Sequence, residues 1–250
     1  MENMRITVIG ASGQIGSRVV ELLTAAGHEV VGASKRTGAD VLTGEGLADA
    51  VAGAAVLVDV TNSPSFEDDP VMDFFSRSSA NLVEAARDAG VGHYVALSIV
   101  GADDLPESGY MRAKVVQERT VAESGLPYTI VRATQFHEFA EMIVASLAVG
   151  GEIRAPKARI QPIAAAEVAA TVADAAQGAP VNGIVNLGGP DKMSFAELAR
   201  TVVARQGEQT PVVVDPSATY FGTPVDDDSL VTGTGAVLGD LRFTDWLASR

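Results

Sequence analysis

A glycine-rich segment near the amino end constrains the fold of this chain more than any other feature. Residues 10–16 read Gly-Ala-Ser-Gly-Gln-Ile-Gly and directly follow an apolar run at 4–9. Apolar residues then recur at helical spacing over 17–23. A strand, a glycine turn and a helix in this order are typical of the first unit of a parallel sheet that binds a dinucleotide. The sequence therefore predicts a pyrophosphate site at residues 10–16.

Each glycine of this segment has a separate expected role. Gly10 allows the tight turn, Gly13 lets the backbone approach the pyrophosphate, and Gly16 lets the helix pack closely on the strand. The N–H groups at the start of the helix and the helix dipole then attract the phosphates. The remaining expected cofactor-binding residues of the turn are Ser12, Gln14 and Ile15. Because the spacing is GxxGxxG rather than GxGxxG, an ordinary turn with another ligand is the alternative.

Composition excludes several functional classes. The 250 residues are enough for one large domain, or for one domain with a small appendage. A net charge of −14 argues against binding to nucleic acid or to anionic membranes. The chain has no cysteine, and we expect no metal site. Since a strand starts almost at the amino end and no apolar stretch could cross a bilayer, a cytoplasmic location is expected.

The middle of the chain alternates between short apolar runs and amphipathic segments. This alternation predicts an α/β fold, a Rossmann-type doubly wound parallel sheet. Its ligand crevice is expected between the strands at 4–9 and 54–60, at their carboxyl ends. The other expected strands are 28–33, 39–42, 93–98 and 128–132, and the expected helices are 46–52, 71–89 and 110–123.

Beyond Ala133 the pattern becomes irregular, which predicts a small C-terminal substrate-binding lobe. Helices are expected at 136–149, 167–176 and 194–205, the last with a capping box of Ser194 and Glu197, and a strand at 184–187. We divide the chain into a cofactor-binding core at 1–135, which residues of about 160–190 rejoin, and a lobe of 136–159 and 191–250.

The residues after the strand at 28–33 indicate which dinucleotide binds. An acidic residue there would suit the ribose hydroxyl of NAD, whereas this chain has Ser34, Lys35 and Arg36. Two cations and a hydroxyl suit a 2′-phosphate, which an arginine can bind with two hydrogen bonds. The sequence therefore predicts NADP(H), with a solvated basic turn as the alternative.

Three polar residues predict a catalytic site. Tyr110 and Lys114 lie four residues apart, on one face of the expected helix, and Ser98 ends the strand before it. An ammonium near a phenol lowers the pKa of the phenol, which makes it a better proton donor at neutral pH. Ser98 can hold the substrate oxygen. This set predicts the reduction of a carbonyl group, while a half-buried tyrosine beside a surface lysine is the alternative.

With these motifs the chain resembles the short-chain dehydrogenase/reductases, specifically their extended and atypical branch with the NmrA-like proteins. Further marks lie at 81–86, 125–132 and 186–190. The resemblance implies Tyr110 as general acid and base, Ser98 as the oxygen-positioning group, and Lys114 as the residue that lowers the tyrosine pKa and bonds the nicotinamide ribose. It also implies that Asp40 and Val41 border the adenine, that Thr61 and Asn62 line the ribose and nicotinamide, and that Asn81 joins a proton relay.

The chain departs from this family in the short segment between Ser98 and Tyr110. Many NmrA-like proteins also lack the tyrosine and act as redox sensors. Substrate contacts are expected from Phe136, His137 and Phe139, which follow the strand at 128–132, although a core role is the alternative. The run Asp226, Asp227 and Asp228 is expected to stay solvated.

The predicted function is therefore an NADP(H)-dependent oxidoreductase that reduces the carbonyl of a small organic substrate. The alternatives are a non-catalytic NADP(H) sensor that binds a partner protein, and a quinone or enone reductase that needs no tyrosine acid. The helix at 71–89 and the helix after Tyr110 either pair two copies of the chain into a homodimer or stay exposed.

Overall fold

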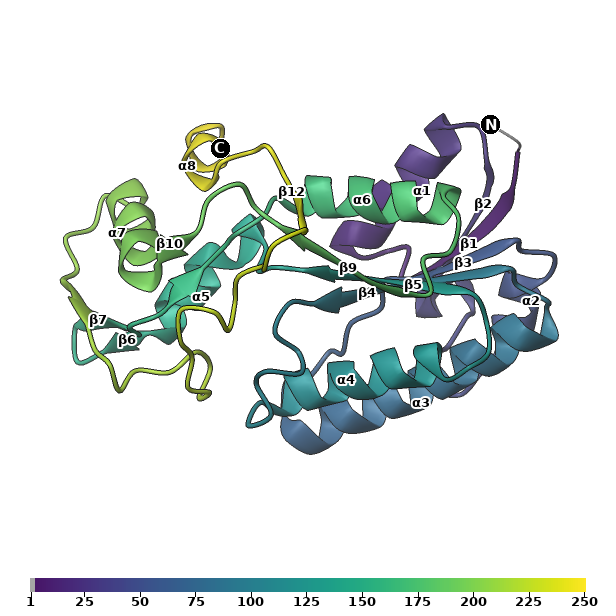
Figure 1. Ribbon diagram of the computed structural model, residues 1–250, viewed down its shortest axis with the longest axis horizontal. Coiled ribbons are helices and arrows are strands. Elements are labelled where there is room, and N and C mark those ends of the chain that lie inside the picture. Colours follow the sequence, from purple (N-terminus) through teal and green to yellow (C-terminus); the bar gives the residue numbers. More distant parts are fainter. Residues whose placement is uncertain (1–2) are drawn as a thin grey trace. The chain divides into compact units, whose positions relative to one another are not determined.

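The computed structural model describes residues 3–250, and its central element is a seven-stranded parallel sheet (Figure 1). The strand order is β12-β9-β5-β4-β3-β1-β2. The strands are β1 (Arg5–Ile9), β2 (Glu29–Ala33), β3 (Val56–Asp59), β4 (His93–Ile99), β5 (Tyr128–Ala133), β9 (Gly183–Gly188) and β12 (Val237–Leu238). Strand β1 pairs with β2 on one side and with β3 on the other. The doubly wound sheet is thus confirmed, with the reversal of strand order at β1.

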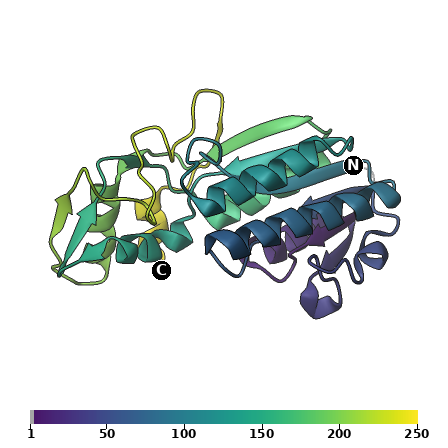
Figure 2. The ribbon, with the colours of Figure 1, turned by 90° about the horizontal axis from the view of Figure 1, so that it is seen from below.

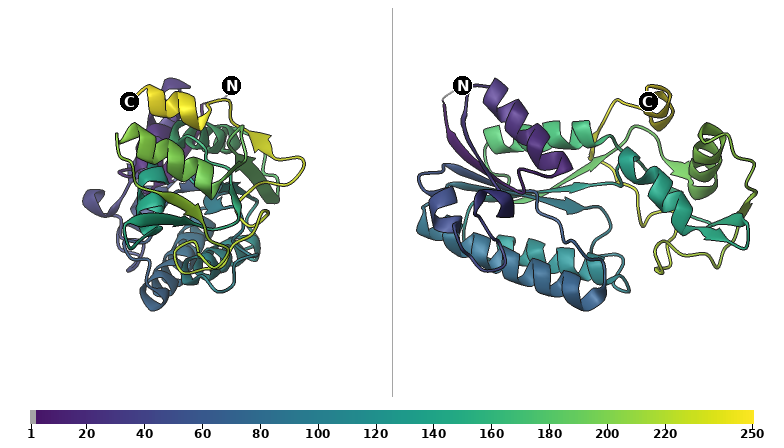
Figure 3. Two further views of the ribbon diagram at one scale, coloured as in Figure 1. Left: turned by 90° about the vertical axis from the view of Figure 1, so that its left-hand side faces the viewer. Right: turned by 180° about the vertical axis from the view of Figure 1, so that it is seen from behind.

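Helices cover both faces of the sheet. Helices α1 (Gln14–Ala25) and α6 (Ala165–Gln177) lie on one face, and α3 (Asp68–Asp88) and α4 (Gly109–Ala122) lie side by side on the other (Figures 2 and 3). The short α2 (Leu47–Val51) precedes β3. Every residue of β3 is buried, as expected for a central strand covered on both faces.

The strand expected at 39–42 was wrong. A short 3₁₀ turn, η1 (Lys35–Thr37), follows β2, and the next residues form turns. Asp40 Oδ1 accepts a hydrogen bond from the N–H of Leu42 at 2.9 Å, which folds the backbone back on itself. An aspartate that bonds its own backbone two residues on favours a turn over a strand.

The chain forms two compact units. The first contains residues up to 98, 109–132 and 166–185, and the second contains 99–108, 133–165 and 186–250. The second unit includes two small sheets, β11-β7-β6 and β10-β8. Its other elements are η2 (His137–Phe139), α5 (Ala140–Ser146), β6 (Ala148–Val149), β7 (Glu152–Ala155), β8 (Arg159–Ile160), β10 (Met193–Ser194), α7 (Phe195–Arg205), β11 (Val212–Val214) and α8 (Phe243–Ala248).

Within the second unit, the structure corrects one expected helix and confirms another. The continuous helix expected at 136–149 was wrong, because a 3₁₀ turn precedes α5 and the chain then enters β6. The capping box of α7 is confirmed, since the N–H of Glu197 donates to Ser194 Oγ and the N–H of Ser194 donates to Glu197 Oε2.

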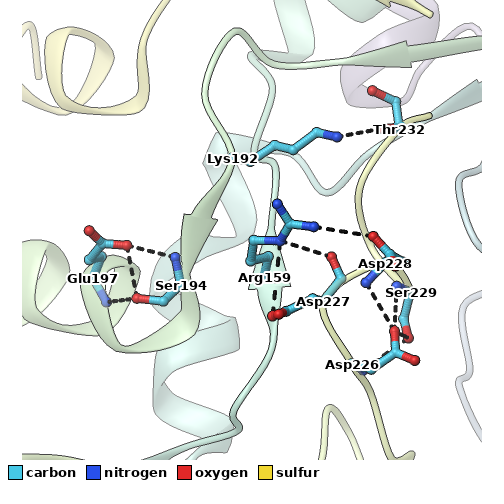
Figure 4. A network of polar contacts seen from close by, with 9 residues as sticks. All are labelled: Arg159, Lys192, Ser194, Glu197, Asp226, Asp227, Asp228, Ser229 and Thr232. Atoms are coloured by element: carbon cyan, nitrogen blue, oxygen red, sulfur yellow. Dashed lines mark hydrogen bonds and ion pairs between the residues drawn. The ribbon is translucent and has the colours of Figure 1, made fainter. Parts of the chain in front are cut away.

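The three aspartates at 226–228 are exposed, as expected, and they also form polar contacts within the second unit (Figure 4). Asp226 Oδ1 accepts from the hydroxyl of Ser229 at 2.7 Å, while Asp227 and Asp228 form ion pairs with Arg159. Within residues 3–250, no group of three or more acidic or histidine side chains could hold a metal ion. In the same range, no helix combines the length and the apolar character needed to cross a membrane.

Candidate functional site

The glycine turn at 10–16 has the geometry that the spacing predicted. Gly10 has a φ of +86°, and a Cβ atom there would lie 2.9 Å from the carbonyl oxygen of Val60. A Cβ atom on Gly16 would overlap the carbonyl oxygen of Gly10. The N–H of Gly13 donates to that same oxygen at 2.9 Å. Only glycine therefore fits at positions 10 and 16 without moving the backbone.

The start of α1 provides free donors for an anion. Gly13 is the N-cap residue, it has no side-chain capping bond, and the first turn carries no acidic side chain. The first N–H groups of a helix have no acceptor within the helix. Ser12, Gly13 and Gln14 are exposed, whereas Ile15 and Gly16 are buried. This arrangement fits a pyrophosphate, because the exposed N–H groups and the helix dipole both favour negative charge.

The end of β2 is joined directly to this turn. The N–H groups of Gly10 and Ala11 both donate to the carbonyl oxygen of Ala33, at 3.0 and 3.2 Å. Ser34 follows, and its N–H donates to the hydroxyl of Thr37 at 2.9 Å, which closes the η1 turn. The loops expected to bind the phosphates and the ribose are therefore neighbours, joined by backbone hydrogen bonds.

The two cations after Ser34 differ in their surroundings. Lys35 Nζ lies 3.1 Å from Asp40 Oδ2, and the N–H of Leu42 and this ammonium both lower the pKa of Asp40. Arg36 is exposed and forms no ion pair within residues 3–250. Arg36 thus has its full charge available to a ligand, whereas the charge of Lys35 is partly balanced.

Two side chains of α3 hold the segment expected to border the adenine. Asn81 Nδ2 donates to the carbonyl oxygen of Val41 at 2.8 Å, and Arg77 donates to that of Leu42 at 2.9 Å. Asn81, which the resemblance placed in a proton relay, here anchors the turn that contains Val41.

The residues after β3 meet the first turn of α4. Asn62 Oδ1 accepts a hydrogen bond from the hydroxyl of Tyr110 at 3.1 Å. The ring of Tyr110 lies between Phe66, with ring centres 5.5 Å apart, and Phe75, at 6.0 Å. Burial raises the pKa of Tyr110 to about 12. This direction is the reverse of the one expected from an ammonium four residues away, because desolvation of the phenolate dominates.

The ammonium of Lys114 is buried and has three contacts of its own. It donates to the carbonyl oxygen of Leu97 at 2.8 Å and to Gln117 Oε1, and it lies 4.5 Å from the centre of the Phe75 ring. Burial lowers the pKa of Lys114 to about 8, while the charges of Asp59 and Glu118 oppose that shift.

Ser98 lies next to the carbonyl group that Lys114 contacts. Its side chain is 6% exposed, and its hydroxyl has no hydrogen-bond partner among the described residues. Such an unpaired hydroxyl is costly in a protein interior and is a common feature of binding sites. Ser98 thus lies near the end of β4, Lys114 bonds to its neighbour Leu97, and Tyr110 bonds to Asn62 after β3.

The expected substrate residues belong to the second unit. The rings of Phe136 and Phe139 stack on each other with centres 5.5 Å apart. His137 points elsewhere, since it is buried against Phe243 and Trp246 of the C-terminal segment.

Three residues were missed from the sequence. Asp59 is wholly buried in β3, and Gln117 bonds to it from α4. Gln135, after β5, is 5% exposed, and both of its amide atoms lack a partner among the described residues. A carboxylate inside the apolar run at 54–60 was a visible signal for Asp59, whereas only the fold brings Gln117 to it.

Comparison with known proteins gives three curated relatives that each match about half of the chain. The Ycf39 photosystem II assembly factor of Cyanophora paradoxa is 28% identical over 149 residues, which cover 54% of this chain and 46% of that protein. A 3-diazoavenalumate denitrifying reductase of Streptomyces is 32% identical over 167 residues, which cover 52% and 55%. The chain therefore spans about half the length of the curated relatives it matches.

Solved structures share the fold over nearly the whole chain. The Bordetella bronchiseptica enzyme WbmG, in complex with NAD and UDP, superposes with a TM-score of 0.72 at 17% identity, covering 99% of this chain and 93% of the other. The dTDP-4-dehydrorhamnose reductase of Bacillus anthracis, in complex with NADP, gives 0.70 at 16% identity, with 86% of each chain covered.

The sequence profile of the family described as NAD(P)H-binding matches residues 10–179, from the glycine turn to the end of α6. The matched range contains the glycine turn, Ser98, Tyr110 and Lys114. This chain therefore belongs to the NAD(P)H-binding family, as the resemblance led us to expect.

Proposed function

We propose that this protein is an NADP(H)-dependent reductase that acts on a carbonyl group of a small organic molecule. The observation that carries the proposal is that Tyr110 bonds to the loop after β3, while Lys114 bonds to the residue before Ser98 near the end of β4. The two acceptors are the side chain of Asn62 and the carbonyl oxygen of Leu97. Ligands of open parallel sheets bind at the carboxyl ends of the strands, near the reversal of strand order.

The choice of NADP(H) rests on the charge after β2. Arg36 is exposed and uncompensated, and no acidic residue stands at the end of β2 to repel a 2′-phosphate. Ser34 adds a hydroxyl at the same turn. Thr61, Asn62 and Val41 complete the proposed cofactor contacts along the loops that follow β2 and β3.

The chain's own groups divide the remaining work. When bound, the cofactor supplies a hydride. Ser98 has a free hydroxyl to hold the substrate oxygen, and Tyr110 has the proton that this oxygen needs after reduction. Lys114 bonds to the carbonyl oxygen of Leu97, the residue before Ser98, and in this proposal its ammonium stabilises negative charge as it develops.

A second candidate is a reductase of quinones or enones that uses no tyrosine acid. It is favoured by the pKa of Tyr110, which burial raises to about 12, and by the contacts that occupy the ammonium of Lys114. A phenol with such a pKa is a weak acid at neutral pH. In this candidate, the product takes its proton from water.

The deciding experiment follows NADPH oxidation with ketones, aldehydes and quinones, for the wild type and for Tyr110→Phe. Tyr128→Phe is a matched control, because Tyr128 lies at the amino end of β5, away from the carboxyl ends of the strands where the proposed site lies. We expect Tyr110→Phe to lower kcat for carbonyl substrates by about 100-fold or more, which is the usual worth of a general acid.

Each result assigns one function. Carbonyl turnover that Tyr110→Phe abolishes and Tyr128→Phe preserves supports the proposal. Quinone turnover that persists in Tyr110→Phe supports the second candidate, in which hydride transfer needs no tyrosine acid. Tight NADPH binding without turnover of any substrate would refute both and favour a cofactor sensor that binds a partner protein. The names of the Ycf39 relatives, which are assembly factors, fit that last outcome.

A further inference from the structure

A buried carboxylate lies at the centre of the first unit, directly below the proposed site. Asp59 is fully buried in β3 and accepts four hydrogen bonds. Its Oδ1 atom accepts from the N–H of Thr61 at 3.0 Å and from the hydroxyl of Thr61 at 2.7 Å. Its Oδ2 atom accepts from the hydroxyl of Tyr94 at 3.1 Å and from Gln117 Nε2 at 2.9 Å. The two N–H partners can only donate, and the two hydroxyls can donate as well, so all four positions suit the acceptor oxygens of a carboxylate.

The cost of this arrangement suggests a role beyond packing. The neighbouring residues of β3 are apolar, and an apolar side chain at position 59 would complete the same buried strand. Burial of a carboxylate carries a large desolvation penalty, which hydrogen bonds offset only when they are complete.

Two routes lead from Asp59 to the two proposed catalytic side chains, one through the backbone of the loop after β3 and one through hydrogen bonds alone. The first runs through Thr61, which fixes the turn into Asn62, and Asn62 accepts from the hydroxyl of Tyr110. The second runs through Gln117, whose Oε1 accepts from the ammonium of Lys114.

The side-chain amide of Gln117 has only one suitable orientation between Asp59 and Lys114. Its Nε2 faces a carboxylate and its Oε1 faces an ammonium, so the two charges together fix the amide. If asparagine replaced Asp59, its one acceptor oxygen could face either Thr61 or the pair Tyr94 and Gln117, and its amide nitrogen would then face donors on the other side. The side-chain amide of Gln117 therefore links the carboxylate of Asp59 to the ammonium of Lys114.

We propose that Asp59 is a positioning residue that holds Tyr110 and Lys114 in one arrangement, through Thr61 and Asn62 on one side and through Gln117 on the other. The inference rests on the proposed function for the roles of Tyr110 and Lys114, whereas the contacts of Asp59 do not depend on that function. The charges of Asp59 in β3 and Glu118 in α4 act on the Lys114 ammonium. Tyr94 of β4 bonds to Asp59, and Arg132 of β5 pairs with Glu118. Tyr110 is the other titratable group of α4 near this site.

The test measures the titration of Lys114 directly. The chain has only four lysines, at 35, 114, 157 and 192, so ¹³C-labelled lysine gives a simple spectrum. The resonance of Lys114 is the one that Lys114→Met removes. In the NADPH-free wild type we expect its midpoint near pH 8, where burial has lowered the pKa of Lys114.

Asp59→Asn should lower that midpoint by about one pH unit, because it removes an opposite charge that raises the pKa of Lys114. Tyr94→Phe is the matched control, since it removes one donor from the same Oδ2 atom but leaves both routes intact. We expect Tyr94→Phe to move the midpoint of Lys114 by less than about 0.3 pH units.

The double variant Asp59→Asn/Gln117→Glu supplies a rescue. A carboxylate at position 117 accepts both from the amide at position 59 and from the ammonium, and the total charge is that of the wild type. We expect it to return the midpoint of Lys114 to the wild-type value or above.

An unchanged midpoint in folded Asp59→Asn, or a double variant that folds without rescue, would overturn the proposal. If Asp59→Asn does not fold, Gln117→Met serves instead, and an unchanged midpoint there overturns it equally. If the wild type turns over no substrate, the proposed function fails, yet the titration still decides the role of Asp59. With turnover, the alkaline limb of the kcat profile should move with the midpoint.

Discussion

The preference for NADP(H) makes a prediction whose size follows from the turn after β2. Arg36→Ala removes the exposed guanidinium, which forms no ion pair within residues 3–250. A charge-assisted hydrogen bond contributes about 1.5–3 kcal/mol, so we expect the Kd for NADPH to rise by about 10- to 150-fold. The Kd for NADH should stay within about threefold, because NADH carries no 2′-phosphate for Arg36 to bind.

Lys35→Ala is the comparison within the same turn. The side chain of Lys35 is 84% exposed, and its ammonium lies 3.1 Å from Asp40. Asp40 cancels part of its attraction for a phosphate, and exposed ion pairs contribute at most about 1 kcal/mol. We therefore expect only about a threefold rise in the Kd for NADPH, well below the effect of Arg36→Ala.

The assay is a titration of the nucleotide's fluorescence with each variant, at low and at moderate salt. Added salt should weaken NADPH binding to the wild type more than to Arg36→Ala, since the lost contact is ionic. Equal losses for NADPH and NADH in Arg36→Ala, or a larger loss in Lys35→Ala, would refute the assignment of the 2′-phosphate to Arg36.

Further expectations concern the glycine turn, one helix cap and the effect of pH. Gly16→Ala should weaken both NADPH and NADH by more than 10-fold in the same titration, because its Cβ atom would overlap the carbonyl oxygen of Gly10; binding at wild-type strength would contradict this. Ser194→Ala should lower the free energy of unfolding by about 1 kcal/mol in urea, through loss of the capping box; an unchanged midpoint would exclude that role. The pKa of Lys114 is about 8 when folded and 10.5 when unfolded, so the unfolded chain binds more protons between these values. Its contribution to the free energy of unfolding should then rise from pH 8 to 9, below the ordinary tyrosine pKa of 10.0, and Lys114→Met should lack this rise.

Much of the first unit follows from local sequence. The glycine turn, the helix after it and the central strands were predictable, because turns and apolar periodicity are set by neighbouring residues. The strand expected at 39–42 was wrong because the Asp40 side chain bonds the backbone of Leu42, a contact that three apolar residues and one aspartate do not reveal. Strands of two to four residues, such as β6, β8 and β12, carry too little pattern to be found.

For the proposed catalytic residues too, the sequence predicted some features and left others to the tertiary structure. The sequence by itself determined that Tyr110 and Lys114 share a helix, that Ser98 ends a strand, and that a glycine turn opens a cofactor site. Tertiary structure decided what these groups touch. It buried the phenol, so that the pKa of Tyr110 rose rather than fell, and it directed Lys114 to Leu97 and Gln117.

Spacing along a helix fixes which side chains are neighbours, but the pKa of a group depends on its solvent and on charges that arrive from distant parts of the chain. Asp59 and Gln117 are 58 residues apart, and only the packing of α4 on the sheet brings them together.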